Sequence, residues 1–314
     1  MLLMHPFLRT VFDSPAGLPV RLGLTWAQAR GQATLVDRWS QSLGIPPLTL
    51  DWLSEGIKPD STLFLLGSGE SVEALTATEW AEVQENFSIG INAWPLHPFV
   101  PNVLAFEPFD DASTDYLQLF ENVLFESRFS SRRPKVLLFR PNKTQDGSRY
   151  LLIPESLRKN ARLYGRFVPN SRNLRTVSRE IAMLGELQRR GGIADALVLD
   201  SGASIIRLVS LGMRLGFTKV VLLGVDLNGG QYFWEKNPKR LAQRSLSSFS
   251  PGFVRPIHET MVRDTKPFVL TEVLGILNEV MRRAGGSLFA GSRESVLSDF
   301  FPVHVWNQSH NPIP

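Results

Sequence analysis

Short apolar runs alternate with helix-like segments along most of this chain. The strand-like runs occupy residues 62–67, 87–92, 102–109, 135–140, 196–200, 219–227, 287–291 and 303–306, and the helix-like segments occupy residues 71–83, 114–127, 202–217 and 267–285. Strands that alternate with helices of this length favour a mainly parallel sheet with helices on both faces. The predicted fold is therefore α/β and Rossmann-like.

The alternation leaves two segments outside it. Residues 1–60 precede the first strand-like run, and they are predicted to be a helical extension with one long helix at 25–43. Residues 61–314 are predicted to form the Rossmann-like domain. Within that domain, residues 141–195 are predicted to be a lid or basic insertion, because basic side chains gather there among apolar ones: Arg158, Lys159, Arg162, Arg166, Arg172, Arg175 and Arg179.

Composition excludes several classes of site. The sequence has no cysteine, so a disulfide framework, a thiolate zinc site and a cysteine nucleophile are ruled out. It shows neither an apolar stretch of membrane-spanning length nor a signal peptide, so we expect a cytoplasmic protein. A formal net charge of +4 suits anionic partners such as nucleotides or phospholipid headgroups and does not call for nucleic acid.

Small and polar residues follow most of the predicted strands. In open parallel sheets, ligands bind at the carboxyl ends of the strands, which makes these residues the first candidates for a site. They are Gly67, Ser68, Gly69, Asn92, Glu107, Ser201, Gly202, Asp226 and Asn228. Each also suits an ordinary turn or helix cap, and Ser201 is predicted to be the N-cap of the helix that follows it.

The turn at residues 67–69 departs from two familiar phosphate-binding patterns. Val72 stands where the dinucleotide fingerprint needs its third glycine, and no Gly-Lys-Ser/Thr occurs. The sequence also lacks an Asp-x-Asp motif, which many sugar transferases use to hold a cation on two phosphates. A donor with one phosphate, neutralised by hydroxyl and backbone donors, fits this pattern.

The order of motifs resembles that of the bacterial sialyltransferases of glycosyltransferase family 42. The motifs are LFLLGSGESVEAL, IGIN, VLAFEP, LDSGASIIRLVSLGMRLGFTKVVLLGVDLNGGQY, a downstream histidine and LFAGSRESVLSDFFP, and they span residues 61–303. The resemblance implies a GT-A-like variant of the Rossmann fold with a lid. It also implies transfer of sialic acid or a related acidic sugar from a CMP donor to a glycan or glycolipid hydroxyl, with inversion and with neither a metal nor another cofactor.

The resemblance extends to individual residues. The first nucleotide-binding turn of the family matches Gly67, Ser68, Gly69 and Ser71, although Ser68 stands where the family commonly has Asn. The donor-binding residues match Asn92, Ser201, Gly202 and Asp226. A phosphate-holding tyrosine matches Tyr232, and the catalytic histidine matches His258.

Three positions depart from the family. Asn228 stands where a second phosphate tyrosine is expected, and Glu107 stands where an asparagine is expected. The segment before Ser201 carries Val198-Leu199-Asp200 in place of an expected arginine. The last two positions face the sugars in the family, so we expect an acidic sugar on CMP without fixing which one.

The chemistry needs a base for the acceptor hydroxyl and donors for the departing phosphate. His258 lies in a polar loop, and histidine titrates in the range that such a base needs. Tyr232 and the amide of Asn228 are the predicted phosphate donors, although Tyr232 is equally suited to pack beside Phe233 and Trp234. The cytidine is expected near Gly67–Gly69, where glycines let the backbone approach and a following helix N-terminus favours negative charge.

Several alternatives stay open. A magnesium-dependent phosphotransferase, similar to the methanogen pterin pyrophosphokinases, shares the glycine-rich turn, and an inactive nucleotide-binding scaffold would explain the departures. The basic residues of 151–179 suit a solvated surface, a lid, or a platform for an anionic glycolipid at the inner membrane face. Family relatives often form oligomers, so the resemblance also leads us to expect a homo-oligomer.

Overall fold

The computed structural model describes residues 18–106, 123–124, 126–139, 155–169, 173–189, 195–237, 259–261 and 268–307. The strands are β1 (Leu63–Leu66), β2 (Phe87–Ile91), β3 (Val103–Phe106), β4 (Lys135–Phe139), β5 (Ala161–Phe167), β6 (Leu197–Leu199), β7 (Lys219–Leu223) and β8 (Ser287–Ala290). The α-helices are α2 (Leu18–Leu43), α3 (Leu50–Ser54), α4 (Ala77–Glu85), α6 (Ser127–Arg132), α7 (Glu155–Arg158), α8 (Leu174–Arg189), α9 (Ser204–Arg214), α10 (Phe233–Lys236) and α12 (Leu270–Arg283). The short 3-10 helices are η2 (Glu70–Ala74), η3 (Trp94–Leu96), η6 (Glu259–Met261) and η7 (Val296–Asp299).

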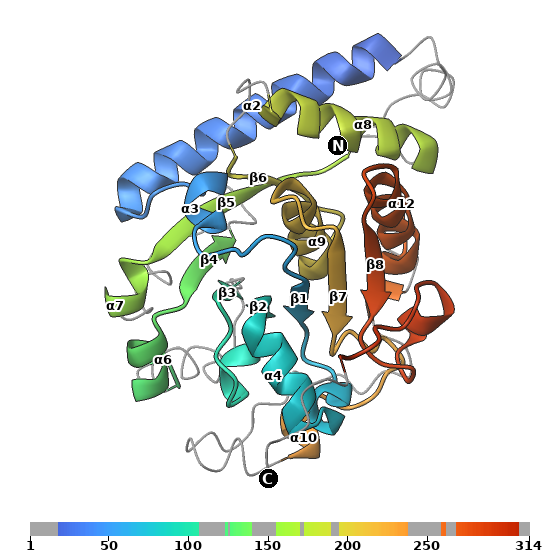
Figure 1. Ribbon diagram of the computed structural model, residues 1–314. Helices are drawn as coiled ribbons and strands as arrows, with labels where there is room; N and C mark the ends of the chain where they lie inside the picture. Colours follow the sequence, from blue (N-terminus) through green and yellow to red (C-terminus); the bar gives the residue numbers. More distant parts are fainter. Residues whose placement is uncertain are drawn as a thin grey trace.

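The strands form one sheet in the order β6-β5-β4-β3-β2-β1-β7-β8, and every neighbouring pair is parallel (Figure 1). This confirms the predicted α/β, Rossmann-like fold. Strands β1 and β2 are buried along their whole length, as their near-continuous apolar sequences require in a sheet covered on both sides.

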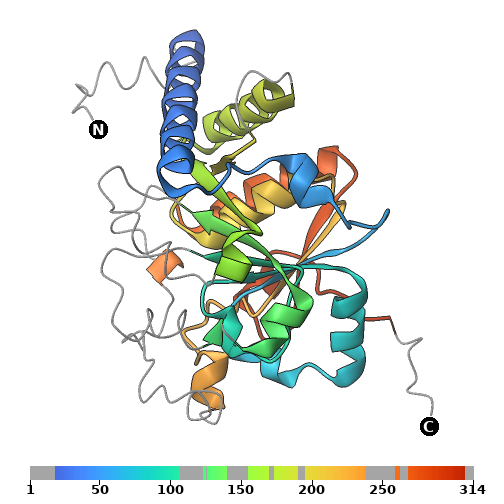
Figure 2. The same ribbon diagram turned by 90° about the vertical axis from the view of Figure 1, so that its left-hand side faces the viewer.

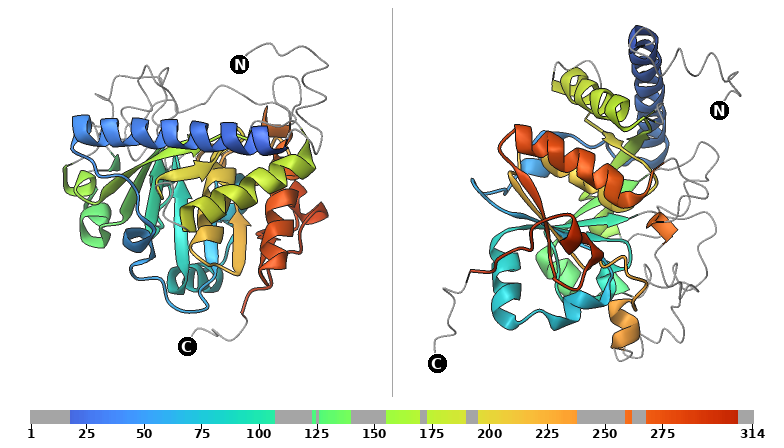
Figure 3. Two further views of the ribbon diagram at one scale, coloured as in Figure 1. Left: turned by 90° about the horizontal axis from the view of Figure 1, so that it is seen from above. Right: turned by 90° about the vertical axis from the view of Figure 1, so that its right-hand side faces the viewer.

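Helices cover both faces of the sheet. Helix α4 lies on one face, whereas α9 and α12 lie on the other (Figure 3). The connections from β1 to β2 and from β7 to β8 run in opposite directions along the sheet. Right-handed crossovers therefore place their helices on opposite faces.

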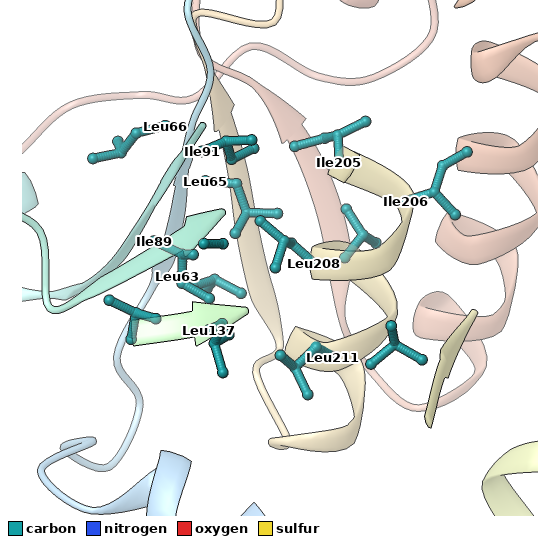
Figure 4. Packing of buried hydrophobic residues seen from close by; sticks show 14 of the residues in the cluster. Leu63, Leu65, Leu66, Ile89, Ile91, Leu137, Ile205, Ile206, Leu208 and Leu211 are labelled. Atoms are coloured by element: carbon teal, nitrogen blue, oxygen red, sulfur yellow. The ribbon is translucent and has the colours of Figure 1, made fainter. Parts of the chain in front are cut away.

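Helix α9 supplies much of the core beneath the centre of the sheet. Residues 205–212 of this helix are all buried. Figure 4 shows Ile205 level with Ile91 and Leu66, the last residues of β2 and β1, and Leu211 near the opposite end of these strands. Helix α9 therefore runs antiparallel to the strands, and its first turn lies at their carboxyl ends.

The N-terminal helices pack on the sheet. Helix α2 lies across β5 and beside α8 at one end of the molecule (Figures 2 and 3). The chain that follows α2 runs parallel to β5, with Pro47 bridged to Leu163 and the Leu48 N–H donating to the Leu163 carbonyl at 2.8 Å. The predicted extension is thus joined to the sheet through its β5 side.

Strand β5 corrects part of the prediction for residues 141–195. Residues 161–167 pair with β4 on one side and β6 on the other, so they belong to the sheet and not to an inserted lid. The basic residues of β5 hid it, because Arg162 and Arg166 alternate with buried apolar residues and are themselves only half-buried.

Two further element boundaries differ from the predictions. The predicted helix 71–83 divides into η2 and α4, because Thr76 starts α4 with a capping box in which its side chain pairs with Glu79. Residues 303–306 form no strand, since only Val303 bridges to Ala290. The predicted helix 114–127 lies almost entirely outside the described residues. None of the described helices is long and apolar enough to cross a membrane.

Candidate functional site

The order of the strands changes direction between β1 and β7. Strand β1 pairs with β2 on one side and with β7 on the other, although about 150 residues separate β1 from β7 in the chain. The connections that leave β1 and β7 diverge to opposite faces of the sheet at this point. Such a switch point opens a crevice at the carboxyl ends of the strands, where ligands bind in open parallel sheets.

The turn after β1 packs directly on the chain that leaves β7. The Gly67 N–H donates to the Leu223 carbonyl at 2.7 Å, and the Gly69 N–H donates to the Gly224 carbonyl at 2.8 Å. A Cβ built on Gly67 would lie within 3.0 Å of the Gly224 carbonyl group. The glycines therefore allow two backbones to meet, and side chains would hold them apart.

This packing occupies backbone N–H groups of the turn near which the cytidine is expected. The N–H of Gly67, Gly69 and Ser71 all have acceptors within the protein. The helix that follows the turn is the five-residue η2, so no long helix directs its N-terminus at this point. Ser68 is the residue of the turn that carries a half-buried hydroxyl side chain at the crevice.

Asp226 holds the turn in place from the β7 side. Its carboxylate accepts a hydrogen bond from the Ser71 hydroxyl at 2.5 Å and another from the Ser71 N–H at 3.0 Å. Burial raises the pKa of Asp226, and the two bonds from Ser71 oppose that rise. Asp226 and Ser71 thus position the turn through each other.

The loop after Asp226 carries backbone strain. Leu227 has φ 63°, a left-handed conformation that a bulky residue rarely adopts, and Gly229 follows with φ 73°. Asn228 is exposed; its amide nitrogen donates to the Glu294 carbonyl at 3.3 Å. The loop returns to the first turn, where Tyr232 forms a bridge with Gly69.

The Tyr232 ring stacks on Trp234, with centroids 4.5 Å apart and planes 9° from parallel. The structure therefore shows Tyr232 as a packed aromatic residue, as the alternative interpretation expected. Tyr232 is only partly buried, and its backbone lies beside the turn at Gly69, so the predicted phosphate contact stays a prediction.

Ser201 and Gly202 lead into α9 at the same edge of the sheet. The N-cap of α9 is Ala203, which makes no side-chain capping bond, so the predicted N-cap role of Ser201 is wrong. Gly202 takes φ 89° to make the turn into the helix. The Ser201 Oγ is buried and has no hydrogen-bond partner among the described residues, which leaves a hydroxyl for a ligand or water.

A charged cluster beside Ser201 was missed by the sequence analysis. Arg207 and Asp200 are almost fully buried and lie 2.7 Å apart, and burial lowers the pKa of the Arg207 guanidinium to about 9. Arg166 lies 3.8 Å from the other carboxylate oxygen of Asp200, with 40% of its side chain exposed. Two arginines therefore lie against one carboxylate near the start of α9. The signal in the sequence was Arg207 itself, a single charge within an apolar helical stretch.

Asn92 completes the described part of the edge. It follows β2 with φ 49°, a conformation that asparagine tolerates better than most residues, and its N–H donates to the Ala105 carbonyl at 2.8 Å. Glu107 and His258 lie outside the described residues. Among the residues that the structure does describe, no group of three or more His, Cys, Asp or Glu side chains is arranged to hold a metal ion.

Comparisons with solved structures find sugar transferases at low similarity. The sialyltransferase CstII from Campylobacter jejuni, in complex with the substrate analogue CMP-3FNeuAc, is 14% identical with a TM-score of 0.42, over 77% of this chain and 86% of that chain. Cst-I from the same organism, a monofunctional alpha-2,3-sialyltransferase, is 13% identical with a TM-score of 0.42, over 81% and 86%. The MAf glycosyltransferase from Magnetospirillum magneticum AMB-1 is 15% identical with a TM-score of 0.41, over 80% of this chain and only 33% of that chain.

At these identities and TM-scores the likeness does not decide an activity. No family model and no curated protein matches the sequence significantly.

Proposed function

We propose that this protein is a glycosyltransferase that moves sialic acid or a related acidic sugar from a CMP donor to a hydroxyl of a glycan or glycolipid. The observation that carries the proposal is the switch point between β1 and β7. The carboxyl edge of the sheet there carries Ser68, Asn92 and Tyr232, and the turn that leads into α9 adds Ser201 and Gly202. Hydroxyl, amide and phenol groups of this kind suit a nucleotide with one phosphate.

The charge near α9 supports an acidic donor. The guanidinium groups of Arg166 and Arg207 lie against Asp200, and α9 begins beside them without a side-chain cap. A helix N-terminus favours negative charge, and the buried Ser201 hydroxyl lacks a partner. In this proposal, Arg166 and Arg207 offset the loss of the arginine that the family carries just before its Ser-Gly pair.

The reaction is a direct displacement. The acceptor oxygen forms a bond to the anomeric carbon of the donor sugar on the face opposite the phosphate, while the bond from that carbon to the phosphate oxygen breaks and its electrons leave with CMP. His258 takes the proton of the acceptor hydroxyl as attack proceeds. Tyr232 and Asn228 donate to the phosphate as its charge grows, which lowers the barrier without a metal.

The remaining assignments follow from the same proposal. Gly67, Gly69, Ser71 and Asp226 shape the nucleotide turn, and Glu107 pairs with a hydroxyl or amine of the donor sugar. The basic residues of 151–179 are proposed to meet an anionic acceptor, including a glycolipid at a membrane surface. A homo-oligomer is also proposed.

The first experiment is a thermal-shift and calorimetric comparison of CMP, CTP, UDP, GDP, ATP and NAD, each with and without Mg²⁺. A ligand that binds only the folded state raises the melting temperature as its concentration exceeds its dissociation constant. Selective stabilisation by CMP without Mg²⁺ supports the proposal. Preference for ATP with Mg²⁺ would replace it with a phosphotransferase.

The second experiment separates a transferase from an inactive scaffold. His258→Ala is expected to abolish turnover of a CMP-sugar while CMP binding persists. Binding of CMP without turnover of any acidic-sugar donor by the unmodified protein would indicate a scaffold. Normal turnover by the His258→Ala variant would remove His258 from the mechanism.

A further inference from the structure

A cavity of about 580 Å³ lies on the α4 side of the switch point. Its walls come from η2 and the start of α4, from the ends of β7 and β8, and from the chain at 303–307. Ser71 and Gly224 line it, and these two residues also belong to the seam between the turn after β1 and the end of β7. The cavity therefore adjoins the proposed donor crevice and has no role in the function described so far.

His304 forms one wall of the cavity and is fully buried. Its Nε2 lies 3.1 Å from Oε1 of Glu82, which fixes the proton on Nε2 when the ring is neutral. Nδ1 is then a bare acceptor, and it has no hydrogen-bond partner among the described residues. This atom is closed to solvent, so His304 contributes packing and its bond to Glu82 to the wall and offers no hydrogen bond to a ligand in the cavity.

The other walls offer an aromatic surface and two charged residues, Glu79 and the exposed Arg293. The Trp306 ring stacks parallel to the buried Phe64 ring, with planes 4° apart, and packs edge-on against His304. Val72, Leu75 and Val303 add apolar surface. The carboxylate of Glu79 is engaged in capping α4 through the N–H and hydroxyl of Thr76.

We propose that this cavity binds a neutral sugar ring and is the acceptor subsite of the transferase. The apolar face of a pyranose packs on the partly exposed Trp306 ring, and its hydroxyls meet the polar side chains that line the cavity, Thr78, Ser292 and Asn307. Pockets with an aromatic wall and one or two fixed polar atoms suit such a ligand, because the ring supplies area and the polar atom sets its orientation. The acceptor assignment rests on the proposed function, whereas binding of the sugar ring does not.

The test measures sugar and nucleotide binding separately in the full chain. Methyl glycosides of glucose, galactose and N-acetylglucosamine are titrated without a donor and followed by ligand-observed NMR, with cyclohexanol as a non-sugar ring. Thr78→Trp fills the cavity, and Ala81→Trp places the same side chain on the exposed part of the same helix outside it. Trp306→Leu removes the aromatic wall and leaves the pair of His304 and Glu82 intact.

Binding of at least one glycoside, weakened at least tenfold by Thr78→Trp and Trp306→Leu but not by Ala81→Trp, is the expected result. Absence of glycoside binding, equal binding by all variants, or a response to cyclohexanol alone would overturn the proposal. CMP binding is measured on the same samples. CMP binding without glycoside binding would overturn the cavity proposal alone, whereas glycoside binding without CMP binding would overturn the transferase function and the acceptor assignment with it.

Discussion

The Ser71 hydroxyl donates a 2.5 Å hydrogen bond to Oδ1 of Asp226, which joins the turn after β1 to the loop after β7 across the switch point. The two residues are 155 positions apart in the chain. Asp226 follows β7 and packs against the turn after β1, because a Cβ built on Gly69 would lie within 3.0 Å of its carboxylate. One buried carboxylate therefore fixes the shape of the crevice floor.

Ser71→Ala removes this bond and leaves the buried carboxylate less well solvated. We expect the free energy of unfolding to fall by about 1–3 kcal/mol at pH 7 in denaturant titrations. The pKa of Asp226 is already raised by burial, and the variant raises it further. A group whose pKa is raised on folding makes the folded protein less stable as the pH rises through that pKa, and the variant enlarges this loss. The difference in unfolding free energy between the variant and the unmodified protein should therefore shrink as the pH falls toward 4.

The matched control for this prediction is Ser298→Ala, which removes an exposed hydroxyl that donates to the Arg293 carbonyl at 3.1 Å. It should change stability by less than about 0.5 kcal/mol. Equal losses of unfolding free energy in the two variants would show that the bond between Ser71 and Asp226 stabilises the fold no more than an exposed hydrogen bond does.

Gly67→Ala tests the close packing of the two backbones at the seam. The new methyl group would collide with the Gly224 carbonyl, which is backbone and cannot rotate away. We expect a loss of about 3 kcal/mol in unfolding free energy. Gly31→Ala in α2 is the control, because no atom lies within 4 Å of the added methyl and alanine favours helix, so it should gain about 0.5–1 kcal/mol.

Much of the fold was accessible from the sequence because parallel strands and their crossover helices leave strong apolar patterns. Strands β1, β2, β4 and β7 and helices α9 and α12 lie within the predicted segments. Strand β5 was missed because its alternate residues include two arginines, and tertiary partners decide where those side chains are tolerated. The guanidinium of Arg162 lies over the Trp52 ring of α3, which no local pattern could predict.

The sequence indicates which residues follow the strands but not which of them meet in the folded chain. The switch point follows from strand order, which only the folded chain reveals. The use of the N–H groups of Gly67 and Gly69 by β7, and the pairing of Asp200 with Arg207 seven residues later, depend on which backbones and side chains meet in space. Residues 303–306 were assigned to a strand from their apolar pattern. Instead, His304 and Asn307 bind Glu82 of α4 beyond the single bridge at Val303.

The pair of His304 and Glu82 predicts a pH dependence of stability. Burial lowers the pKa of His304 below its ordinary value of 6.5, with Lys219 acting in the same direction and Glu82 and Glu79 opposing it. Between the folded pKa and about 6.5, the unfolded chain binds more protons than the folded one. The free energy of unfolding should therefore fall as pH drops through this range, by about 1.4 kcal/mol for each unit by which the two pKa values differ.

His304→Phe keeps an aromatic ring against Phe64 and Trp306 and removes the titrating group. Denaturant titrations between pH 7.5 and 5 should show a flatter pH dependence for this variant than for the unmodified protein. Parallel curves for the two proteins would show that other groups cause the dependence.

Arg166 is expected to discriminate an acidic donor from its nucleotide. Its guanidinium is partly exposed beside Asp200, and the carboxylate of a CMP-linked sialic acid would gain from pairing with this exposed cation. Arg166→Ala should weaken CMP-sialic acid binding about five- to tenfold, corresponding to about 1–1.4 kcal/mol, and leave CMP binding nearly unchanged. The difference should narrow at high ionic strength, because salt screens a partly exposed charge.

Arg162→Ala is the matched control, since Arg162 points to the same side of β5 four residues earlier and lies over Trp52. Calorimetry measures the affinity for both ligands. An equal loss of affinity for CMP and CMP-sialic acid, or the same loss in Arg162→Ala, would show that Arg166 does not recognise the acid group of the donor.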